Sequence, residues 1–316
     1  MLVKTVRIAT RGSDLALVQA RYVASRVEKE LGLKTELVVI STTGDQIQNI
    51  SLSKIGGKGL FIKEIEEALL AGRADLAVHS AKDLPASIAP GLRLSAFPQR
   101  EDPRDALIGR EVGQTLLGLP QGARIGTGST RRASQLLSRR PDLEIVPLRG
   151  NVPTRLKKLD SESLTAVILA CAGLDRLGFS DVISERISPD VMLPAVCQGT
   201  LALETREGDD LDQEIARLDS EEHAVAAEAE RAFLRRLGGD CTIPLAAYCE
   251  SLGGGHIRVR ARLASPDGSA VFRAERHGGI DEAGAIGTAL AEEILKAGGD
   301  ALLQELRALN QSDDSH

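Results

Sequence analysis

Short apolar runs alternate with amphipathic stretches through the first two thirds of the chain. The run Val3–Thr10 has the length and apolar content of a buried strand, and Lys34–Ser41 is similar. Between them, apolar residues recur at helical spacing over about Asp14–Leu31, and Ser13 can cap that helix. This order of strand, helix and strand predicts α/β units built on parallel sheets.

The alternation continues, and beyond about Ser220 it gives way to a different pattern. The first part adds one predicted helix and four predicted strands: Phe61–Ala71, then Asp75–His79, Arg124–Gly128, Glu144–Leu148 and Thr165–Ala170. The last part is expected to contain a helix, three strands and a final helix: Glu221–Leu237, Ile243–Cys249, His256–Leu263, Val271–Glu275 and Asp281–Leu309. The last part is therefore typical of an α+β domain on a small antiparallel sheet.

Composition narrows the classes of partner. The chain has 316 residues, 42% hydrophobic and 27% charged, which is the make-up of a soluble globular protein with two or three domains. A net charge of −6 and an aromatic content of 2% argue against nucleic acid as a partner. Because no apolar run reaches membrane-spanning length and no signal peptide is evident, we expect a cytoplasmic protein. The four cysteines and five histidines fit no zinc spacing, so we expect no metal site.

Arginines recur where a buried strand is followed by the start of a helix. The members of this set are Arg11, Arg131, Arg132, Arg149, Arg155 and Arg176. Cations are disfavoured at helix starts, which carry partial positive charge, and a guanidinium fork suits carboxylate or phosphate. The carboxyl ends of parallel strands meet at one edge of a sheet, where ligands bind. The pattern therefore predicts a crevice for a small molecule with several negative charges.

Three further segments could carry chemistry, and each also has an ordinary interpretation. Asp83 could simply stabilise a helix start, but its place after the strand Asp75–His79 favours a carboxylate that stabilises a cation formed in a reaction. Cys241 lies in the glycine-rich turn Leu237–Pro244. It could be a cysteine without a role, or a nucleophile that forms a covalent bond. The segment Lys54–Gly59 suggests a mobile basic loop, although taken alone a plain solvated loop is favoured.

Several colinear segments together resemble the hydroxymethylbilane synthase family, also called the porphobilinogen deaminase family. They are Ala9–Ser13, Lys54–Phe61, Ala77–Pro85, Gly126–Arg132, Arg149–Val152 and Pro194–Gly199. The resemblance implies two α/β domains like those of type II periplasmic binding proteins and a C-terminal α+β domain. The boundaries expected are 1–98 with 197–219, 99–196 and 220–310, followed by a disordered tail at 311–316.

The resemblance also implies an activity. Members of the family are transferases of porphyrin, heme and other tetrapyrrole biosynthesis that join four porphobilinogen molecules head to tail and release ammonia at each condensation. Hydrolysis then frees hydroxymethylbilane. The growing chain is primed by a dipyrromethane cofactor, which the resemblance attaches through a thioether to Cys241. We expect a monomer without nucleic acid, membrane or metal partners.

Residue roles are implied by the matching positions. Asp83 matches the carboxylate that stabilises the cation left when ammonia departs. The cofactor-binding positions are matched by Lys82, Asp83, Thr127, Ser129, Arg131 and Arg132. The positions that bind substrate carboxylates or act in elongation are matched by Arg11, Ser13, Arg149, Arg155 and Arg176. Lys54 and Lys58 fall on a flexible loop over the cleft, and Cys197 stands where the family usually has glycine.

Two alternatives belong to other functional classes. A non-catalytic binding protein for an organic anion could have the same fold. A cysteine hydrolase would need a base beside Cys241, and the sequence does not exclude a distant His79 for that role.

Overall fold

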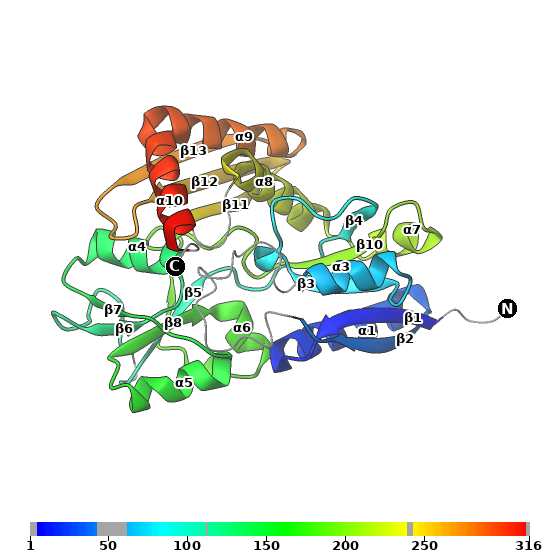
Figure 1. Ribbon diagram of the computed structural model, residues 1–316, viewed down its shortest axis with the longest axis horizontal. Helices are drawn as coiled ribbons and strands as arrows, with labels where there is room; N and C mark the ends of the chain where they lie inside the picture. The colour runs from blue at the N-terminus through cyan, green and yellow to red at the C-terminus, as the bar shows by residue number, and fades with distance from the viewer. Residues whose placement is uncertain (1–4, 43–61, 112, 239–242, 314–316) are drawn as a thin grey trace.

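The computed structural model describes residues 5–42, 62–111, 113–238 and 243–313, which form two α/β lobes and a third, C-terminal unit (Figure 1). The first lobe is built on a five-stranded sheet of order β2-β1-β3-β10-β4. Its strands are β1 (Thr5–Arg11), β2 (Lys34–Ile40), β3 (Leu76–Ser80), β4 (Leu92–Ala96) and β10 (Leu201–Arg206). Its helices are α1 (Asp14–Leu31), α3 (Lys63–Leu70) and α7 (Asp210–Ala216).

Alternate side chains of β1 explain why this sheet is covered on both faces. Ile8 packs with Val23 and Val27 of α1, whereas its neighbour Ala9 packs with Leu69 of α3 on the opposite face. The predicted cap of α1 is confirmed, since the Ser13 hydroxyl accepts a hydrogen bond from the backbone N–H of Ala16 at 3.4 Å.

The second lobe repeats the plan with a five-stranded sheet of order β7-β6-β8-β5-β9. Its strands are β5 (Asp105–Gly109), β6 (Arg124–Gly126), β7 (Glu144–Val146), β8 (Ala166–Ala170) and β9 (Glu185–Ile187). Its helices are α4 (Thr130–Arg139), α5 (Val152–Ser161) and α6 (Cys171–Arg176), followed by the short 3-10 turn η3 (Ser180–Val182).

Both sheets are mixed, which corrects the expectation of parallel sheets. In the first lobe β10 runs antiparallel to β3 and β4, and in the second β5 runs antiparallel to β8 and β9. The chain crosses between the lobes twice, through residues 97–104 (the first crossing) and 188–200 (the second crossing). Each crossing enters the next lobe at the edge of the sheet where its parallel strands end. The first strand after the crossing, β5 or β10, must therefore run antiparallel to them.

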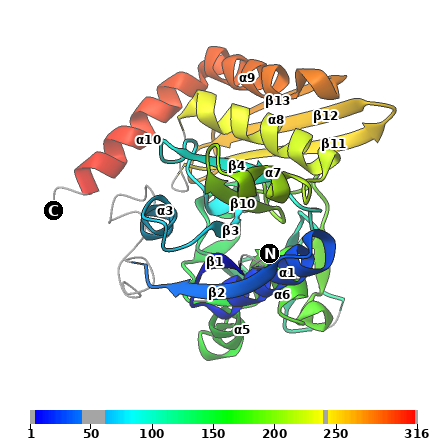
Figure 2. The same cartoon turned by 90° about the vertical axis from the view of Figure 1, so that its right-hand side faces the viewer.

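The third unit has the predicted α+β layout. Its antiparallel sheet consists of β11 (Leu245–Gly253), β12 (His256–Ala264) and β13 (Val271–Gly279), and it packs against α8 (Glu221–Leu237) and α9 (Ala283–Ile294) (Figure 2). The predicted single final helix is wrong. A short 3-10 turn, η4 (Ile280–Glu282), leads into α9, and a π-helical segment, η5 (Leu295–Gly299), separates α9 from α10 (Asp300–Asp313). Gly298 breaks the helix there with a φ of 112°.

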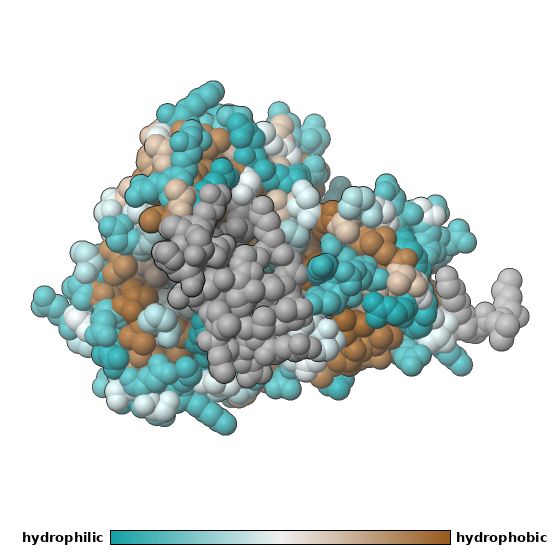
Figure 3. Space-filling view, viewed as in Figure 1, coloured by the Kyte–Doolittle hydropathy of each residue, from teal (hydrophilic) through white to brown (hydrophobic). Residues whose placement is uncertain are grey.

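The fold class predicted from the sequence is confirmed: two α/β lobes precede a C-terminal α+β unit with a small antiparallel sheet. The last helix extends to Asp313, so residues 311–313, predicted as a disordered tail, are helical. Hydrophilic residues surround scattered apolar patches on the face shown in Figure 3. Within the described ranges, none of the helices combines the length and the apolar character needed to cross a bilayer.

Candidate active site

Lys82 and Asp83 lie where the buried strand β3 ends. They belong to the 3-10 turn η2 (Ala81–Asp83), whose first N–H donates to the Thr200 carbonyl of the second crossing at 3.0 Å. Asp83 is exposed and Lys82 is half-buried. Loss of hydration lowers the pKa of Lys82 to about 8, although the charge of Asp83 opposes the change.

Thr127 and Ser129 shape the loop between β6 and α4. The Thr127 hydroxyl accepts from the Ser129 N–H at 3.2 Å, and the Ser129 hydroxyl caps α4 by accepting from the Arg132 N–H at 3.4 Å. Between them, a Cβ on Gly128 would lie 2.4 Å from the Leu148 carbonyl oxygen, so only glycine fits. The local sequence thus fixes the position of the next two arginines.

Arg131 and Arg132 converge on one buried carboxylate, that of Asp105. An Nη1 of Arg131 lies 2.7 Å from one Asp105 oxygen, and an Nη2 of Arg132 lies 2.8 Å from the other. Burial alone would raise the pKa of Asp105, but the two guanidinium groups outweigh it and hold that pKa well below its usual range. Nη1 of Arg131 also donates to the Leu193 carbonyl, and Nη1 of Arg132 to the Ile168 carbonyl.

Arg155 lies on the first turn of α5, which Asn151 caps. Its Nε donates to the Gly150 carbonyl at 2.7 Å. Burial lowers its pKa to about 10, and the neighbouring charges of Arg132 and Arg149 act in the same direction, while Asp83 opposes them. Arg155 is therefore a cation in a setting that disfavours its charge.

The two lobes contribute to one electrostatic cluster. Its members act on one another's charge, and they are the cations Lys82, Arg131, Arg132, Arg149 and Arg155 with the carboxylates Asp83 and Asp105. Five positive and two negative groups leave an excess of three positive charges among these described residues. The structure thus brings together six of the predicted site residues and adds Asp105, which sequence reasoning missed.

The remaining predicted residues lie elsewhere or outside the described ranges. Arg11 ends β1, beside β3, and Ser13 caps α1. Arg176 ends α6 at the second crossing, where its Nη2 donates to the Gly199 carbonyl at 2.8 Å and burial lowers its pKa. The residues outside the described ranges are Cys241, Lys54 and Lys58.

Sequence reasoning also missed the residues that join the three units. Arg100 of the first crossing pairs with the fully buried Glu230 of α8, with Nη1 and Oε1 2.7 Å apart. Nε of Arg100 donates to the Gln198 carbonyl of the second crossing at 2.8 Å. The Gln198 side chain donates in turn to Asp105 at 2.9 Å. In the sequence, the only indication was that Arg100 is a charged residue between two predicted domains. Its partner, Glu230, is identified only by the fold.

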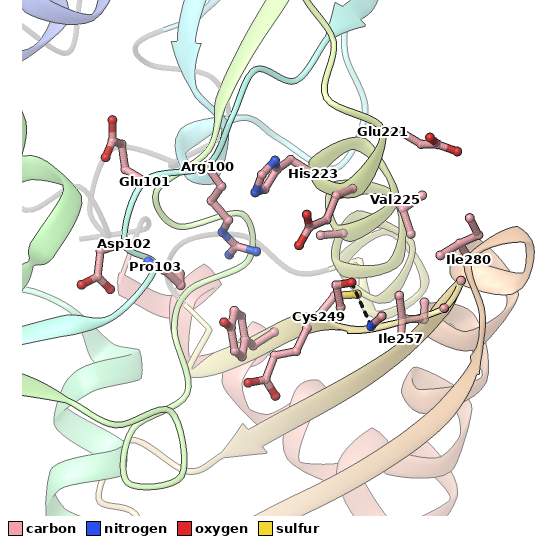
Figure 4. A pocket seen from close by; sticks show the side chains of 18 residues that line it. Arg100, Glu101, Asp102, Pro103, Glu221, His223, Val225, Cys249, Ile257 and Ile280 are labelled. Atoms are coloured by element: carbon pink, nitrogen blue, oxygen red, sulfur yellow. Dashed lines mark hydrogen bonds between the residues drawn. The ribbon is translucent and has the colours of Figure 1, made fainter.

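A separate cavity of about 520 Å³ lies between the first crossing and the third unit. Figure 4 shows Arg100 of the crossing and His223 and Val225 of α8 bordering it. Neither Asp83 nor the arginines of the cluster line this cavity. It is therefore distinct from the candidate site.

The histidine considered for a cysteine hydrolase, His79, has a buried carboxylate partner. His79 is buried in β3, and its Nε2 lies 3.0 Å from Glu204 of β10. His223, near the start of α8, lies 2.7 Å from the Ser220 hydroxyl. From His223 to the last residue of α8, Leu237, the helix advances about 21 Å at about 1.5 Å per residue. Both histidines thus have polar partners among the described residues, a carboxylate for His79 and a hydroxyl for His223.

These features define a two-lobed α/β protein with a cationic site shared between the lobes and a third unit that is bound to the crossings between them. Residues 6–214 match the family model described as porphobilinogen deaminase, dipyromethane cofactor binding domain. Residues 224–296 match that of the porphobilinogen deaminase C-terminal domain. The chain belongs to the porphobilinogen deaminase family.

Named relatives extend over almost the whole chain. The porphobilinogen deaminase of Syntrophus aciditrophicus is 50% identical over 303 residues, which cover 95% of this chain and 98% of the relative. That of Syntrophomonas wolfei is 46% identical over 306 residues, covering 96% and 99%. Among solved structures, an ABC transporter periplasmic substrate-binding protein from Coxiella burnetii aligns with a TM-score of 0.41 and 14% identity, over 67% of this chain and 89% of that one. At that level the likeness says nothing about activity.

Proposed function

We propose that this protein is a hydroxymethylbilane synthase, a transferase that condenses four porphobilinogen molecules on a dipyrromethane primer. The observation that carries the proposal is the cluster in which Asp83 of one lobe faces an excess of cations from the other. Porphobilinogen bears acetate and propionate groups, so each addition to the chain brings two more carboxylates. A site with surplus positive charge suits such a polyacid.

The residues present fit the cofactor. Lys82 and Arg155 both have lowered pKa values, because they are partly dehydrated and lie beside other cations. Carboxylates bound among them would restore a favourable environment for their charge. When bound, dipyrromethane supplies the α-carbon that accepts the first pyrrole. Its carboxylates would be held by Lys82, Arg131 and Arg132, with Thr127 and Ser129 shaping the loop.

Asp83 has the chemistry required for the condensation. Loss of ammonia from porphobilinogen leaves an electron-poor pyrrole that carries positive charge. A fixed carboxylate at the end of η2 stabilises that charge and also accepts a hydrogen bond from the pyrrole N–H. The arginines on the facing lobe hold the carboxylates of the same pyrrole, so the reacting atoms are oriented.

The remaining roles are assigned by position. Arg149 and Arg155 lie in the cluster and bind carboxylates of the substrate and of the growing chain. Arg11 ends β1, the strand that pairs with β3, and Ser13 caps the helix that follows it. Arg176 lies at the second crossing, where it would act as the chain lengthens. A monomeric state and a cytoplasmic location remain predictions.

The described cysteines support attachment of the cofactor at Cys241. Cys171, Cys197 and Cys249 are all buried, and burial raises the pKa of each to about 12. At neutral pH such thiols are protonated and unreactive. These values argue against the other three cysteines and so support Cys241 as the proposed attachment site.

Intact mass of the denatured protein tests the proposal. The protein should be heavier than its sequence by one dipyrromethane, and Cys241→Ser should lose that increment while Cys171→Ser keeps it. Asp83→Ala should carry the cofactor and lose at least about 100-fold in turnover. A protein with the mass of its sequence alone, which releases an organic anion on denaturation, would instead be a binding protein.

A further inference from the structure

Arg231 on α8 reaches from the third unit to the chain segment that follows Asp83. The side chain is 4% exposed. Its Nη2 donates to the carbonyl of Pro85 at 3.0 Å and to that of Ala86 at 3.3 Å. These carbonyls lie two and three residues after Asp83, so the guanidinium holds the backbone on which the carboxylate is mounted.

This arrangement is unfavourable for Arg231 itself. Burial lowers its pKa, and its Nη1 has no hydrogen-bond partner among the described residues. No carboxylate in the described part of the chain lies within ion-pair distance of it. An apolar residue of similar size would avoid the cost of burying a charge without a carboxylate partner. Packing therefore does not explain why arginine stands here.

Core packing holds the residues on both sides of Asp83. Before Asp83, the Ala81 N–H donates to Thr200 and the Ala81 side chain joins the apolar core of the third unit; after it, the Leu84 side chain joins the same core. After Leu84 the backbone turns away, and the Pro85 and Ala86 carbonyls accept from Arg231. With the backbone held before and after it, the exposed Asp83 is mounted on a fixed segment.

We propose that Arg231 is a positioning residue for Asp83, through which the third unit orients the reaction centre in the first lobe. This inference rests on the catalytic role proposed for Asp83. It assigns the third unit a part in the condensation chemistry that is separate from its carrying Cys241.

The test compares Arg231→Met and Arg231→Lys with a matched control, Arg235→Met. Arg235 lies one turn further along α8 and is exposed, so its removal deletes the same charge from the same helix. Each variant is purified as holoenzyme, and turnover is expressed per molecule of cofactor measured by intact mass. Thermal unfolding and hydrogen exchange of the peptide covering residues 81–87 are measured alongside.

In Arg231→Met, kcat should fall about tenfold to hundredfold because a shift of about 1 Å at a reacting group has that effect. KM should stay within about twofold, and the unfolding temperature within about 4 °C, since a costly buried charge is removed. Exchange over residues 81–87 should rise. Arg231→Lys, which can still donate to one carbonyl, should recover part of kcat, and Arg235→Met should match the parent.

Three results would overturn the proposal: an Arg231→Met kcat equal to that of the control, unchanged exchange over residues 81–87, or a loss explained wholly by unfolding. If Arg231→Met does not fold, the Arg231→Lys variant becomes the test. A kcat equal to the parent's, together with faster exchange over residues 81–87, would show that holding this segment does not affect catalysis and would contradict the proposal. The Asp83→Asn variant distinguishes a failure of this inference from a failure of the catalytic role proposed for Asp83. If that variant keeps its turnover, the catalytic role of Asp83 is wrong, whatever Arg231 does.

Discussion

Asp105 Oδ2 lies 2.7 Å from Nη1 of Arg131, in a pair whose side chains are both buried. The same carboxylate also binds Arg132 and accepts a hydrogen bond from Gln198. The two guanidinium groups therefore share one carboxylate, which holds both in place but neutralises only one of their two positive charges. The sequence pattern led us to expect that these arginines depend on an external anion. The protein supplies the first anion itself and leaves one positive charge for a ligand.

Asp105→Asn should lower the free energy of unfolding of the cofactor-free protein by about 3–5 kcal/mol, because two buried guanidinium groups lose their counter-ion. Urea unfolding of the Cys241→Ser background measures this without interference from the cofactor. Asp160→Asn is the control, since Asp160 is exposed and lies 4.0 Å from Arg110. A loss no greater than the control's would show that the arginines find other partners.

The same carboxylate predicts a pH dependence with a definite sign. The pKa of Asp105 is lowered in the folded state, so its contribution is fully present above the unfolded pKa of about 4 and decreases as pH falls below it. The difference in stability between the parent and Asp105→Asn should therefore shrink between about pH 4 and pH 2. A difference that stays constant over that range would contradict the ion pair.

Lys82 should be unusually reactive towards amine-acylating reagents. With a pKa of about 8, its amine is already largely neutral at pH 9. Its acylation rate, followed by peptide mass spectrometry on Cys241→Ser protein, should therefore rise to about pH 8–9 and then level off. Attached cofactor should slow labelling, since bound carboxylates favour the charged form. The exposed Lys157 in the same digest serves as control and should be unaffected by the cofactor; a Lys82 rate that climbs through pH 10 would count against the prediction.

Local patterns predicted the elements that depend on local sequence. The bounds of α8, Glu221–Leu237, agree with the structure, and so does the Ser13 cap of α1. The break in the final helix was missed although Gly298 and Gly299 stand side by side in the sequence, because the apolar periodicity continues across them. Helical spacing alone does not report a left-handed residue.

The direction of a strand is the property that the sequence could not supply. The apolar pattern of a buried strand is the same whether the strand runs parallel or antiparallel to its neighbours. Only the pairing of the strand decides which of its ends faces the site. Asp105 begins β5, and since β5 is antiparallel to β8, that first residue lies opposite Ala170 at the end of β8. No strand was predicted from the sequence at Asp105–Gly109, so Asp105 could not be placed beside the arginines. The arginines after β6 and β8, which are Arg131, Arg132 and Arg176, were predicted because those two strands run parallel, as assumed.

Cys197 should be better replaced by glycine than by alanine. Its φ of 56° is left-handed, which costs a residue with a Cβ about 1–2 kcal/mol. Both substitutions lose the buried thiol, but only glycine relieves the strain, so Cys197→Gly should be more stable than Cys197→Ala by about 1 kcal/mol. Urea unfolding gives the comparison. Cys249, in the strand β11, is the control, and there alanine should be the more stable by about 0.5–1 kcal/mol; the same order at both positions would refute the strain.

We expect the Glu230 carboxylate to stabilise the contact between the third unit and both crossings. It is fully buried, pairs with Arg100, and accepts from the Cys249 N–H at 3.0 Å. Glu230→Met and Arg100→Met should each cost about 3–5 kcal/mol, whereas the double variant should cost less than their sum, with a coupling of about 1–3 kcal/mol. The exposed pair Arg236–Glu292 serves as control and should show a coupling under about 1 kcal/mol. If the Arg100 and Glu230 effects simply add, the two residues stabilise the joint independently, and the crossings are not held through this ion pair.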